Sequence, residues 1–346
     1  MFGRSAKPIR VQVFGKTDVG RSREHNEDRF LVADLTRKDA SLQPQVRQHD
    51  LGERGSLFVV ADGMGGAAAG ELASQMATDT IFAHLLKAWN AESEATPQRF
   101  AHRLKEAVEV ANASIHAHAK AHPEVKGMGT TTTAAGVLGD HLYLTQVGDS
   151  RAYLVRGGVA HQLTKDQSLM QRLVEAGELT EEEAAQSERR NIILQALGPD
   201  PKVKVDLTHQ EVRRGDVLVL CSDGLSGQVK KEEIAQIVTQ ASDLSSACDK
   251  LIALANARGG PDNITVVMAR FDGDGLRSSG DQEEVGHQVY PLIDTETSTE
   301  PVPIYKGSRT PVPNREVREA RGRVFTIVLA ALAVVAAVLW YFTRSP

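Results

Sequence analysis

Five short apolar segments of the chain each carry a carboxylate at one end. The acids in these positions are Glu27 with Asp28, Asp62, Asp149, Asp223 and Asp262. Neighbouring strands of an antiparallel sheet run in opposite directions, so an acid that ends one strand and an acid that begins the next can share one edge of the sheet. The positions therefore predict a cluster of carboxylates, although a single Asp-Gly pair is by itself typical of a turn.

A carboxylate cluster of this kind is typical of a site for divalent cations. Carboxylates that lie close together repel one another unless a positive charge compensates them. Oxygen donors favour Mg²⁺ or Mn²⁺ over Zn²⁺, and Gly63 after Asp62 allows the unusual backbone angles that free its carbonyl as a further ligand. Two such ions about 4 Å apart turn a bridging water into a nucleophile that attacks phosphorus in line, without a covalent intermediate. Arg23, four residues before Glu27, could grip the phosphate oxygens in a bidentate contact.

Strand patterns dominate the part of the chain that carries these acids. Strands are expected at 9–14, 29–33, 57–61, 131–138, 141–147, 152–156, 216–221 and 264–270. Several are joined by short Gly/Asp turns, as in hairpins. Apolar residues at helical spacing predict helices at 70–87, 99–119, 167–176, 180–186 and 231–239. Hairpins with interspersed helices indicate an α+β fold with helices packed on antiparallel sheets, and the polar stretch 35–55 is expected to be a loop.

The overall composition limits the class of function. The 346 residues include 40 Lys and Arg against 45 Asp and Glu, which gives a net charge of −5. A mildly acidic chain is a poor candidate for binding nucleic acid through a basic surface, so no nucleic-acid partner is expected. The two cysteines, Cys221 and Cys248, lie in unrelated contexts and fit a reducing compartment.

The end of the chain differs from the rest. One domain is expected over residues 8–272, followed by a disordered linker at 273–323 that is rich in Gly, Ser, Thr, Pro and acids. The 19 residues 324–342 contain no charge, Pro or Gly, and as a helix they would span about 28 Å, close to the hydrocarbon core of a bilayer. Four arginines precede this segment, at positions 315, 318, 321 and 323, and Arg344 follows it. The asymmetry predicts a single-pass transmembrane helix in the cell inner membrane with the large domain in the cytoplasm.

Eight segments in a fixed order resemble motifs of the metal-dependent protein Ser/Thr phosphatases, the PPM or protein phosphatase 2C-like family, in its bacterial form. They are TDVGRSREHNED at 17–28, VVADGMGGAAAGELAS at 59–74, GTTTTAAGV at 129–137, VGDSRAYLVRGG at 147–158, LTKDQSL at 163–169, NIILQALG at 191–198, LVLCSDGL at 218–225 and GGPDNITVVM at 259–268. The resemblance implies a four-layer α/β/β/α sandwich with a dinuclear Mn²⁺ or Mg²⁺ centre between the sheets. It also implies that the substrates are phosphorylated proteins, among them Ser/Thr kinases.

The resemblance also implies roles for individual residues. Asp62 would bridge the two ions, Glu27 and the Gly63 carbonyl would serve one ion, and Asp223 and Asp262 the other. Asp28 would support these ligands from behind, and Arg23 would hold the substrate phosphate. Asp149 with Asp223 would offer a weaker third metal site, and residues 164–191 would form a flap over the cleft.

Two positions depart from the family pattern. Many relatives have a histidine, proposed as a general acid, where this chain has Met64, which cannot donate a proton. Gly227 stands where other members have an acid or Asn, so the third metal site lacks one expected ligand.

Two alternatives remain open from the sequence. Residues 63–68 fit the G-x-G-x-x-A pattern of a strand-to-helix turn in NAD(P)-binding oxidoreductases, although no acid ends a second strand some 20 residues later. A catalytically silent, membrane-anchored adaptor that binds phosphoproteins would also use the same surface.

Overall fold

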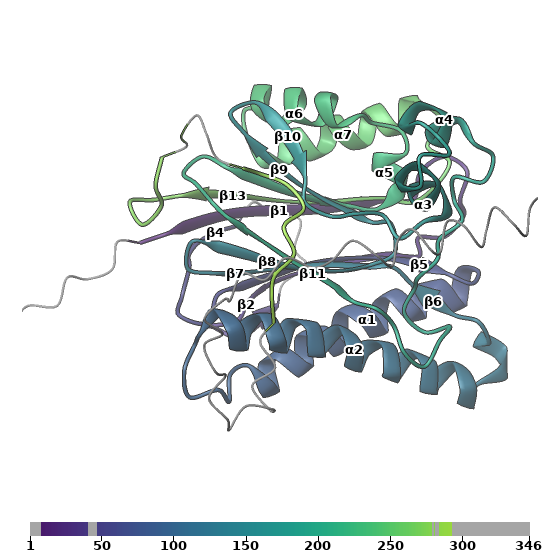
Figure 1. Ribbon diagram of the computed structural model, residues 1–346, viewed down its shortest axis with the longest axis horizontal. Helices are drawn as coiled ribbons and strands as arrows, with labels where there is room; N and C mark the ends of the chain where they lie inside the picture. Colours follow the sequence, from purple (N-terminus) through teal and green to yellow (C-terminus); the bar gives the residue numbers. More distant parts are fainter. Residues whose placement is uncertain (1–7, 41–46, 279, 281–283, 293–346) are drawn as a thin grey trace, which may run out of the picture. The chain divides into compact units, whose positions relative to one another are not determined.

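Two antiparallel sheets stack face to face in the computed structural model (Figure 1). The six-stranded sheet has the order β10 (Val159–Gln162), β9 (Arg151–Arg156), β12 (Val217–Cys221), β13 (Ile264–Asp272), β1 (Arg10–Asp18) and β4 (Arg47–Asp50). The seven-stranded sheet has the order β11 (Asp206–Glu211), β8 (His141–Val147), β7 (Thr132–Leu138), β5 (Ser56–Met64), β2 (Asp28–Asp34) and β3 (Asp39–Ala40), with β6 (Gly129–Thr130) beside the end of β5. Every pairing between these strands is antiparallel.

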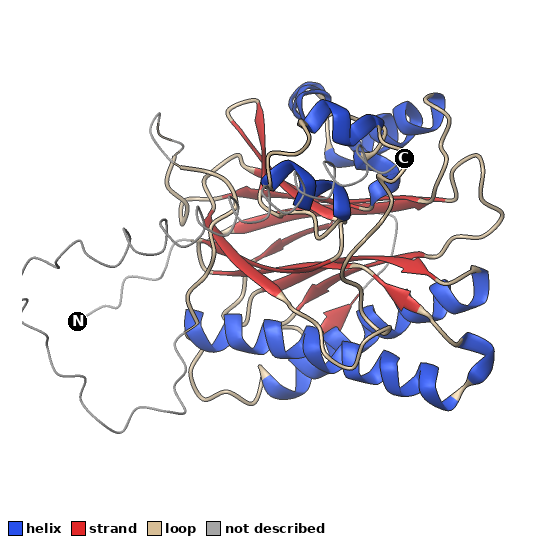
Figure 2. Cartoon of the chain, turned by 45° about the vertical axis from the view of Figure 1, so that its right-hand side comes forward, coloured by secondary structure: helices blue, strands red, loops and turns tan. Residues whose placement is uncertain are grey.

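Helices cover the outer face of each sheet (Figures 1 and 2). The long helices α1 (Ala67–Ala88) and α2 (Pro97–Ala121) lie on the seven-stranded sheet, whereas α6 (Lys231–Gln240) and α7 (Leu244–Ala257) lie on the six-stranded sheet. Shorter helical segments are α3 (Leu169–Glu175), α4 (Glu181–Gln186), α5 (Asp223–Ser226) and the 3-10 turn Pro123–Val125. The four layers confirm the predicted α+β class and the α/β/β/α sandwich.

The central strands are apolar on both faces because both faces are covered. In β5, Val59 and Ala61 belong to the core under α1 and α2, whereas Phe58 and Val60 belong to the core between the two sheets. A third core lies between the six-stranded sheet and α6 and α7. This burial explains why β5 reads as a continuous apolar run up to Asp62 and not as an alternating one.

The structure describes residues 8–40, 47–278, 280 and 284–292. The chain divides into the unit Met1–Ile293 and the unit Asp294–Pro346, and the second unit lies outside the described residues, as does the predicted span 324–342. Among the helices of the described part, none is both long and apolar enough to cross a membrane.

Several elements differ from the sequence-based expectation. The stretch 35–55, expected to be a loop, contains β3 and β4, and β4 pairs with β1 at the edge of the six-stranded sheet. The composition of β4, Arg-Gln-His-Asp, gives no apolar alternation, because this edge strand buries little of its surface. The prediction also missed α7, which begins at the N-cap Asp243, and β11.

The linker expected at 273–323 differs from the structure over residues 284–292. These residues run along β11, the outermost strand of the seven-stranded sheet. The Gln288 carbonyl accepts a hydrogen bond from the His209 N–H at 2.9 Å, and the Tyr290 N–H donates to the Leu207 carbonyl at 3.0 Å. The Tyr290 ring also meets the Tyr143 ring edge-on at 5.3 Å. The polar composition of this segment predicted a linker. Its pairing with the edge strand β11 could not be predicted, because that strand lies about 80 residues earlier in the chain.

Candidate metal and phosphate site

The predicted acids gather at one end of the two sheets, where α5 and β6 lie in Figure 1. Asp28 opens β2 directly opposite Asp62 near the end of β5, because these strands pair antiparallel. Asp223 follows β12, and Asp262 precedes β13, the strand that pairs with β12. The negative charges of Asp28, Asp223, Asp149 and Asp262 all act on Asp62. The two sheets therefore contribute acids to one cluster.

The environment of these carboxylates disfavours their charged form. Burial, with the added charges of Asp28 and Asp223, raises the pKa of Asp62 well above its usual range. Burial raises the pKa of Asp28 to about 7, and burial with the charge of Asp223 raises the pKa of Asp149 to about 7. Burial also raises the pKa of Glu27 and, together with the charge of Asp262, that of Asp223. When these carboxylates are ionised, the surrounding protein groups do not fully compensate their negative charge.

Asp28 shows this incomplete compensation at the level of single atoms. Its carboxylate is 3 % exposed, and Oδ2 accepts a hydrogen bond from the Ser222 hydroxyl at 2.7 Å. The other oxygen, Oδ1, is buried and makes no hydrogen bond with any of the described residues. A buried carboxylate oxygen left in this way is costly, and a cation nearby would offset the cost.

Two glycines bring Glu27 close to the end of β5. The Gly63 N–H donates to the Glu27 carbonyl at 3.2 Å, and a Cβ at position 63 would lie 2.2 Å from the Gly70 carbonyl oxygen. A Cβ at position 70, in the first turns of α1, would lie 1.8 Å from Oε2 of Glu27. The Glu27 carboxylate therefore rests against bare backbone at Gly70. Sequence reasoning missed Gly70, although a glycine inside an apolar helical pattern often has a packing reason.

Threonines fix the backbone of Asp62. The Asp62 carbonyl accepts hydrogen bonds from the Thr130 hydroxyl and from the Thr131 N–H, both at 2.8 Å. The Asp62 N–H donates to the Thr131 hydroxyl at 3.2 Å. The threonine run 130–133 is buried beside β5, so these hydrogen bonds fix the backbone of Asp62 near the end of the strand.

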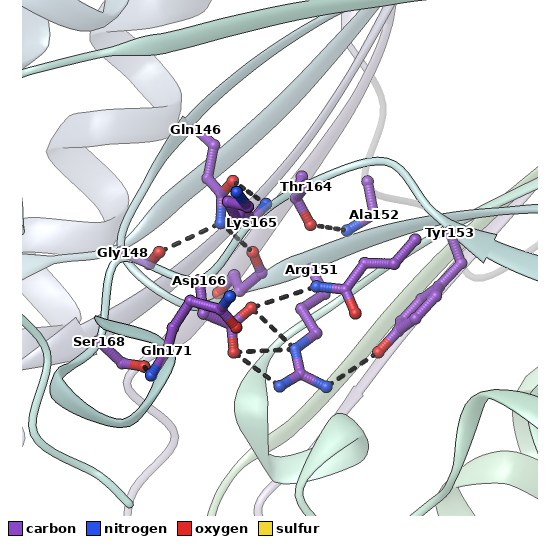
Figure 3. Close-up of polar contacts among 12 residues, drawn as sticks. Gln146, Gly148, Arg151, Ala152, Tyr153, Thr164, Lys165, Asp166, Ser168 and Gln171 are labelled. Atoms are coloured by element: carbon purple, nitrogen blue, oxygen red, sulfur yellow. Dashed lines mark hydrogen bonds and ion pairs between the residues drawn. The ribbon is translucent and has the colours of Figure 1, made fainter. Parts of the chain in front are cut away.

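A glutamine, Gln146, fixes the turn that carries Asp149 (Figure 3). Gln146 donates through Nε2 to the carbonyls of Gly148 at 3.1 Å and Ser150 at 3.3 Å, which flank Asp149. Next to this turn, Arg151 forms a bidentate ion pair with Asp166, with Nη2 to Oδ2 at 2.6 Å. Asp149 itself is 9 % exposed, and the positive charge of Arg151 partly offsets the rise of its pKa.

Arg23 lies at the exposed rim of the cluster. Its Nη2 donates to Oδ2 of Asp262 at 2.7 Å, and its side chain is 49 % exposed. Its guanidinium thus already binds an anionic oxygen at this position.

Within the described ranges, no three acidic, histidine or cysteine side chains are arranged so that they could hold an ion as they stand. One of the predicted ligands, Asp262, is instead engaged with another side chain, that of Arg23. The donor set nevertheless fits Mg²⁺ or Mn²⁺, because it consists of carboxylate oxygens. The pKa of Asp62 and that of Asp28 are raised, and Oδ1 of Asp28 makes no hydrogen bond within the described part of the chain.

The dinucleotide-binding alternative does not agree with the fold. The pattern at 63–68 does lie between a strand and a helix, β5 and α1. That fingerprint belongs to a unit of parallel strands, whereas β5 pairs antiparallel with β2, β6 and β7.

Comparisons with known proteins agree with this architecture. The profile of the family described as "Protein phosphatase 2C" matches residues 32–259. The serine/threonine phosphatase stp of Listeria monocytogenes is 38 % identical over 258 residues, which cover 74 % of this chain and 94 % of that protein. The solved structure of the S. agalactiae serine/threonine phosphatase superposes with a TM-score of 0.66 at 35 % identity, covering 75 % of this chain and 99 % of that chain.

A second solved structure bears on the metals. The catalytic domain of the serine/threonine protein phosphatase PstP, in complex with 2 manganese ions, has a TM-score of 0.61 and 36 % identity, and the match covers 76 % of this chain and 99 % of that chain. PstP of Mycobacterium tuberculosis is 42 % identical over 213 residues, which cover 62 % of this chain and 40 % of that protein. With the matched profile and the shared architecture, the chain belongs to the protein phosphatase 2C family.

Proposed function

We propose that the acid cluster and Arg23 carry out the activity of this chain, the hydrolysis of phosphoserine and phosphothreonine in proteins. Two Mn²⁺ or Mg²⁺ ions are the cofactors of this activity, and when bound they supply an activated water and neutralise charge on the phosphate. The observation that carries the assignment is the gathering of Asp28, Asp62, Asp149, Asp223 and Asp262 at one end of the sandwich, where burial raises the carboxyl pKa of the first four.

The chain's own residues divide the work as follows. Asp62 would bridge the ions, Glu27 and the Gly63 carbonyl would hold one ion, and Asp223 and Asp262 the other. Asp28 would not bind an ion itself but would support the neighbouring ligands, and its hydrogen bond with Ser222 fixes its own position. The contact of Glu27 with Gly70 supports this division, since it leaves the Glu27 carboxylate little freedom to move.

Asp149 and Asp223 would form a third, weaker site. At this position Gly227 offers no side-chain oxygen, so the two carboxylates would have to be completed by water. The general acid for the leaving serine or threonine oxygen would be a water as well, because Met64 has no proton to donate.

Arg23 would exchange its carboxylate partner for the phosphate of the substrate. A guanidinium binds phosphate oxygens in the same bidentate manner as it binds a carboxylate, and the exposed side chain of Arg23 can reach both. We expect Arg23→Ala to raise KM for a phosphothreonine peptide by about tenfold or more, which corresponds to about 1.4 kcal/mol of lost binding.

Phosphate release from phosphoserine, phosphothreonine and phosphotyrosine peptides tests the assignment. With Mn²⁺, the first two should be hydrolysed, and a chelator should abolish the activity. Arg258→Ala is the matched control for Arg23→Ala, because Arg258 also pairs with a carboxylate at the surface, that of Glu233 at 2.6 Å. Equal effects of the two variants, or turnover in the presence of chelator, would refute the roles.

We further propose that residues 324–342 anchor the chain in the inner membrane, with the phosphatase domain in the cytoplasm. The proposal is supported by the uncharged composition of this segment and the arginines before it. Such a tether would favour phosphoproteins near the membrane, including Ser/Thr kinases. The full chain should sediment with membranes, and the double variant Leu332→Arg/Val335→Arg should release it, since each central arginine costs about 2.5–3.5 kcal/mol of insertion. A wild-type chain found in the soluble fraction would contradict the anchor.

A further inference from the structure

The segment that carries both Arg23 and Glu27 has no regular secondary structure of its own. It runs from Val19 to Glu27, between β1 and β2. The segment's own backbone therefore does not set the distance between the guanidinium of Arg23, which would bind phosphate, and the carboxylate of Glu27, which would bind metal. Hydrogen bonds to another part of the chain must do so.

The side-chain amide of Asn263, at the start of β13, supplies three of these hydrogen bonds. Its Nδ2 donates to the carbonyls of Val19 and His25, each at 2.9 Å. Its Oδ1 accepts from the N–H of Glu27 at 2.8 Å. One amide group therefore contacts the segment at its first residue, at its last residue and near its end.

The orientation of this amide follows from its partners. The NH₂ group faces two carbonyl oxygens and the amide oxygen faces an N–H, so a flipped amide would place like groups opposite each other at all three contacts. Asn263 is 4 % exposed, so water is a poor substitute for these bonds.

The neighbouring residue ties the same segment to the acid cluster. Asp262 accepts through Oδ1 from the N–H of Asn263 at 2.9 Å and through Oδ2 from Arg23 at 2.7 Å. The Arg21 N–H donates to the Gly260 carbonyl at 2.7 Å. Residues 260–263 thus position the segment 19–27 through hydrogen bonds.

We propose that Asn263 is a positioning residue that sets the placement of Arg23 and Glu27 relative to Asp262. Its amide holds both the metal-binding Glu27 and the phosphate-binding Arg23 in place. Loss of this amide therefore weakens cation binding and phosphate binding together. The proposal rests on the metal role of Glu27 and the phosphate role of Arg23 proposed above.

Asn263→Asp is the sharpest test, because it keeps the shape of the side chain. A carboxylate can still accept from the Glu27 N–H, but it faces the carbonyls of Val19 and His25 with an oxygen and no proton. We expect the Kd for Mn²⁺ and the KM for a phosphothreonine peptide both to rise by about tenfold or more, the range found when groups that orient metal ligands are removed.

Asn112→Asp is the matched control. Asn112 on α2 is 1 % exposed, donates to the Asp200 carbonyl at 3.1 Å and accepts from the Gly198 N–H at 2.8 Å. It is therefore also a buried amide that holds a loop, but a loop without proposed ligands. We expect a comparable loss of thermal stability in both variants, with Mn²⁺ affinity and KM altered only in Asn263→Asp.

Amide hydrogen exchange of the metal-free protein separates this proposal from the assignment of the ligands. Exchange over residues 19–27 should accelerate by about tenfold or more in Asn263→Asp and in the milder Asn263→Ser, but not in Asn112→Asp, since local opening is set by local hydrogen bonds. Unchanged exchange at 19–27, or Mn²⁺ affinity within about twofold of the wild type in either Asn263 variant, would overturn the positioning role. Failure of the ligand roles would appear instead as normal activity in Glu27→Gln and Arg23→Ala.

Discussion

A carboxylate precedes β12 and another follows it, and their surroundings differ. Asp216, before the strand, is 1 % exposed and receives a bidentate contact from Arg156, with Nε to Oδ1 at 3.0 Å and Nη2 to Oδ2 at 2.6 Å. It also accepts from the Arg213 N–H at 2.8 Å. Asp223, after the strand, lies among Asp62 and Asp262, and burial together with the charge of Asp262 raises its pKa.

The difference separates two uses of a buried acid. At Asp216 the protein provides its own cation, so the carboxylate can hold the end of the sheet. At Asp223 the nearby carboxylates add to the unfavourable charge, which makes this end of the sandwich suited to external cations and less stable without them. A carboxylate at a strand end therefore indicates a metal site only where no buried side chain of the protein neutralises its charge.

The largest difference between the effect on catalysis and the effect on stability is expected for Asp62→Asn. Loss of the carboxylate that would bridge the ions should lower kcat for a phosphothreonine peptide by about 10³-fold or more, about 4 kcal/mol. In chelator, the same change should leave the thermal midpoint unchanged or raise it, because it removes a charge that neighbouring carboxylates repel. Wild-type turnover, or a marked loss of stability in chelator, would contradict the comparison.

Asp216→Asn should have the opposite profile. The substitution leaves the buried guanidinium of Arg156 without this carboxylate, which should lower the free energy of unfolding by about 3–5 kcal/mol. Urea unfolding measures this loss, and the protein that remains folded should keep its kcat. Asp249→Asn serves as a control, because the exposed pair of Asp249 with Lys16 should contribute about 1 kcal/mol or less. A loss of kcat without a loss of stability would refute the structural role.

Local patterns in the sequence predicted the strands and the acids at their ends. A run such as Leu57–Phe58–Val59–Val60–Ala61 followed by Asp62 is visible within a few residues, and the antiparallel arrangement brings these ends together. Contacts between distant segments were not predictable in this way. The edge strand β4 has no apolar pattern, and the roles of Gly70 and Asn263 depend on contacts with the distant segment 19–27.

Gly70→Ala should separate function from stability at the metal end. The new methyl group would lie 1.8 Å from Oε2 of Glu27, so this carboxylate must move. We expect Mn²⁺ affinity and kcat/KM to fall by about 10–100-fold. Alanine is the better helix former by about 1 kcal/mol, so the thermal midpoint in chelator should not fall. Calorimetric titration with Mn²⁺ measures the affinity, and an unchanged value would show that the backbone yields instead of Glu27.

The last contrast concerns the pH dependence of the free energy of unfolding without metal. In the folded domain the pKa of Asp28 and that of Asp149 are raised to about 7 from the ordinary value of 3.8. Between these values the unfolded chain has lost the protons that the folded domain keeps. The contribution of each group is therefore fully present below pH 3.8 and is lost as the pH rises through 7, at up to about 1.4 kcal/mol per pH unit.

Unfolding by urea between about pH 5 and pH 8, in chelator and in saturating Mn²⁺, measures this loss. Bound cations favour the ionised carboxylates, so the decline in chelator should flatten in Mn²⁺. Burial lowers the pKa of His49, His161 and His209, which makes stability rise with pH in the same range, but these groups contribute in both conditions. The difference between the two curves therefore isolates the acid cluster. Parallel curves would mean that the carboxylates of the acid cluster are neutralised by the protein itself, as Asp216 is.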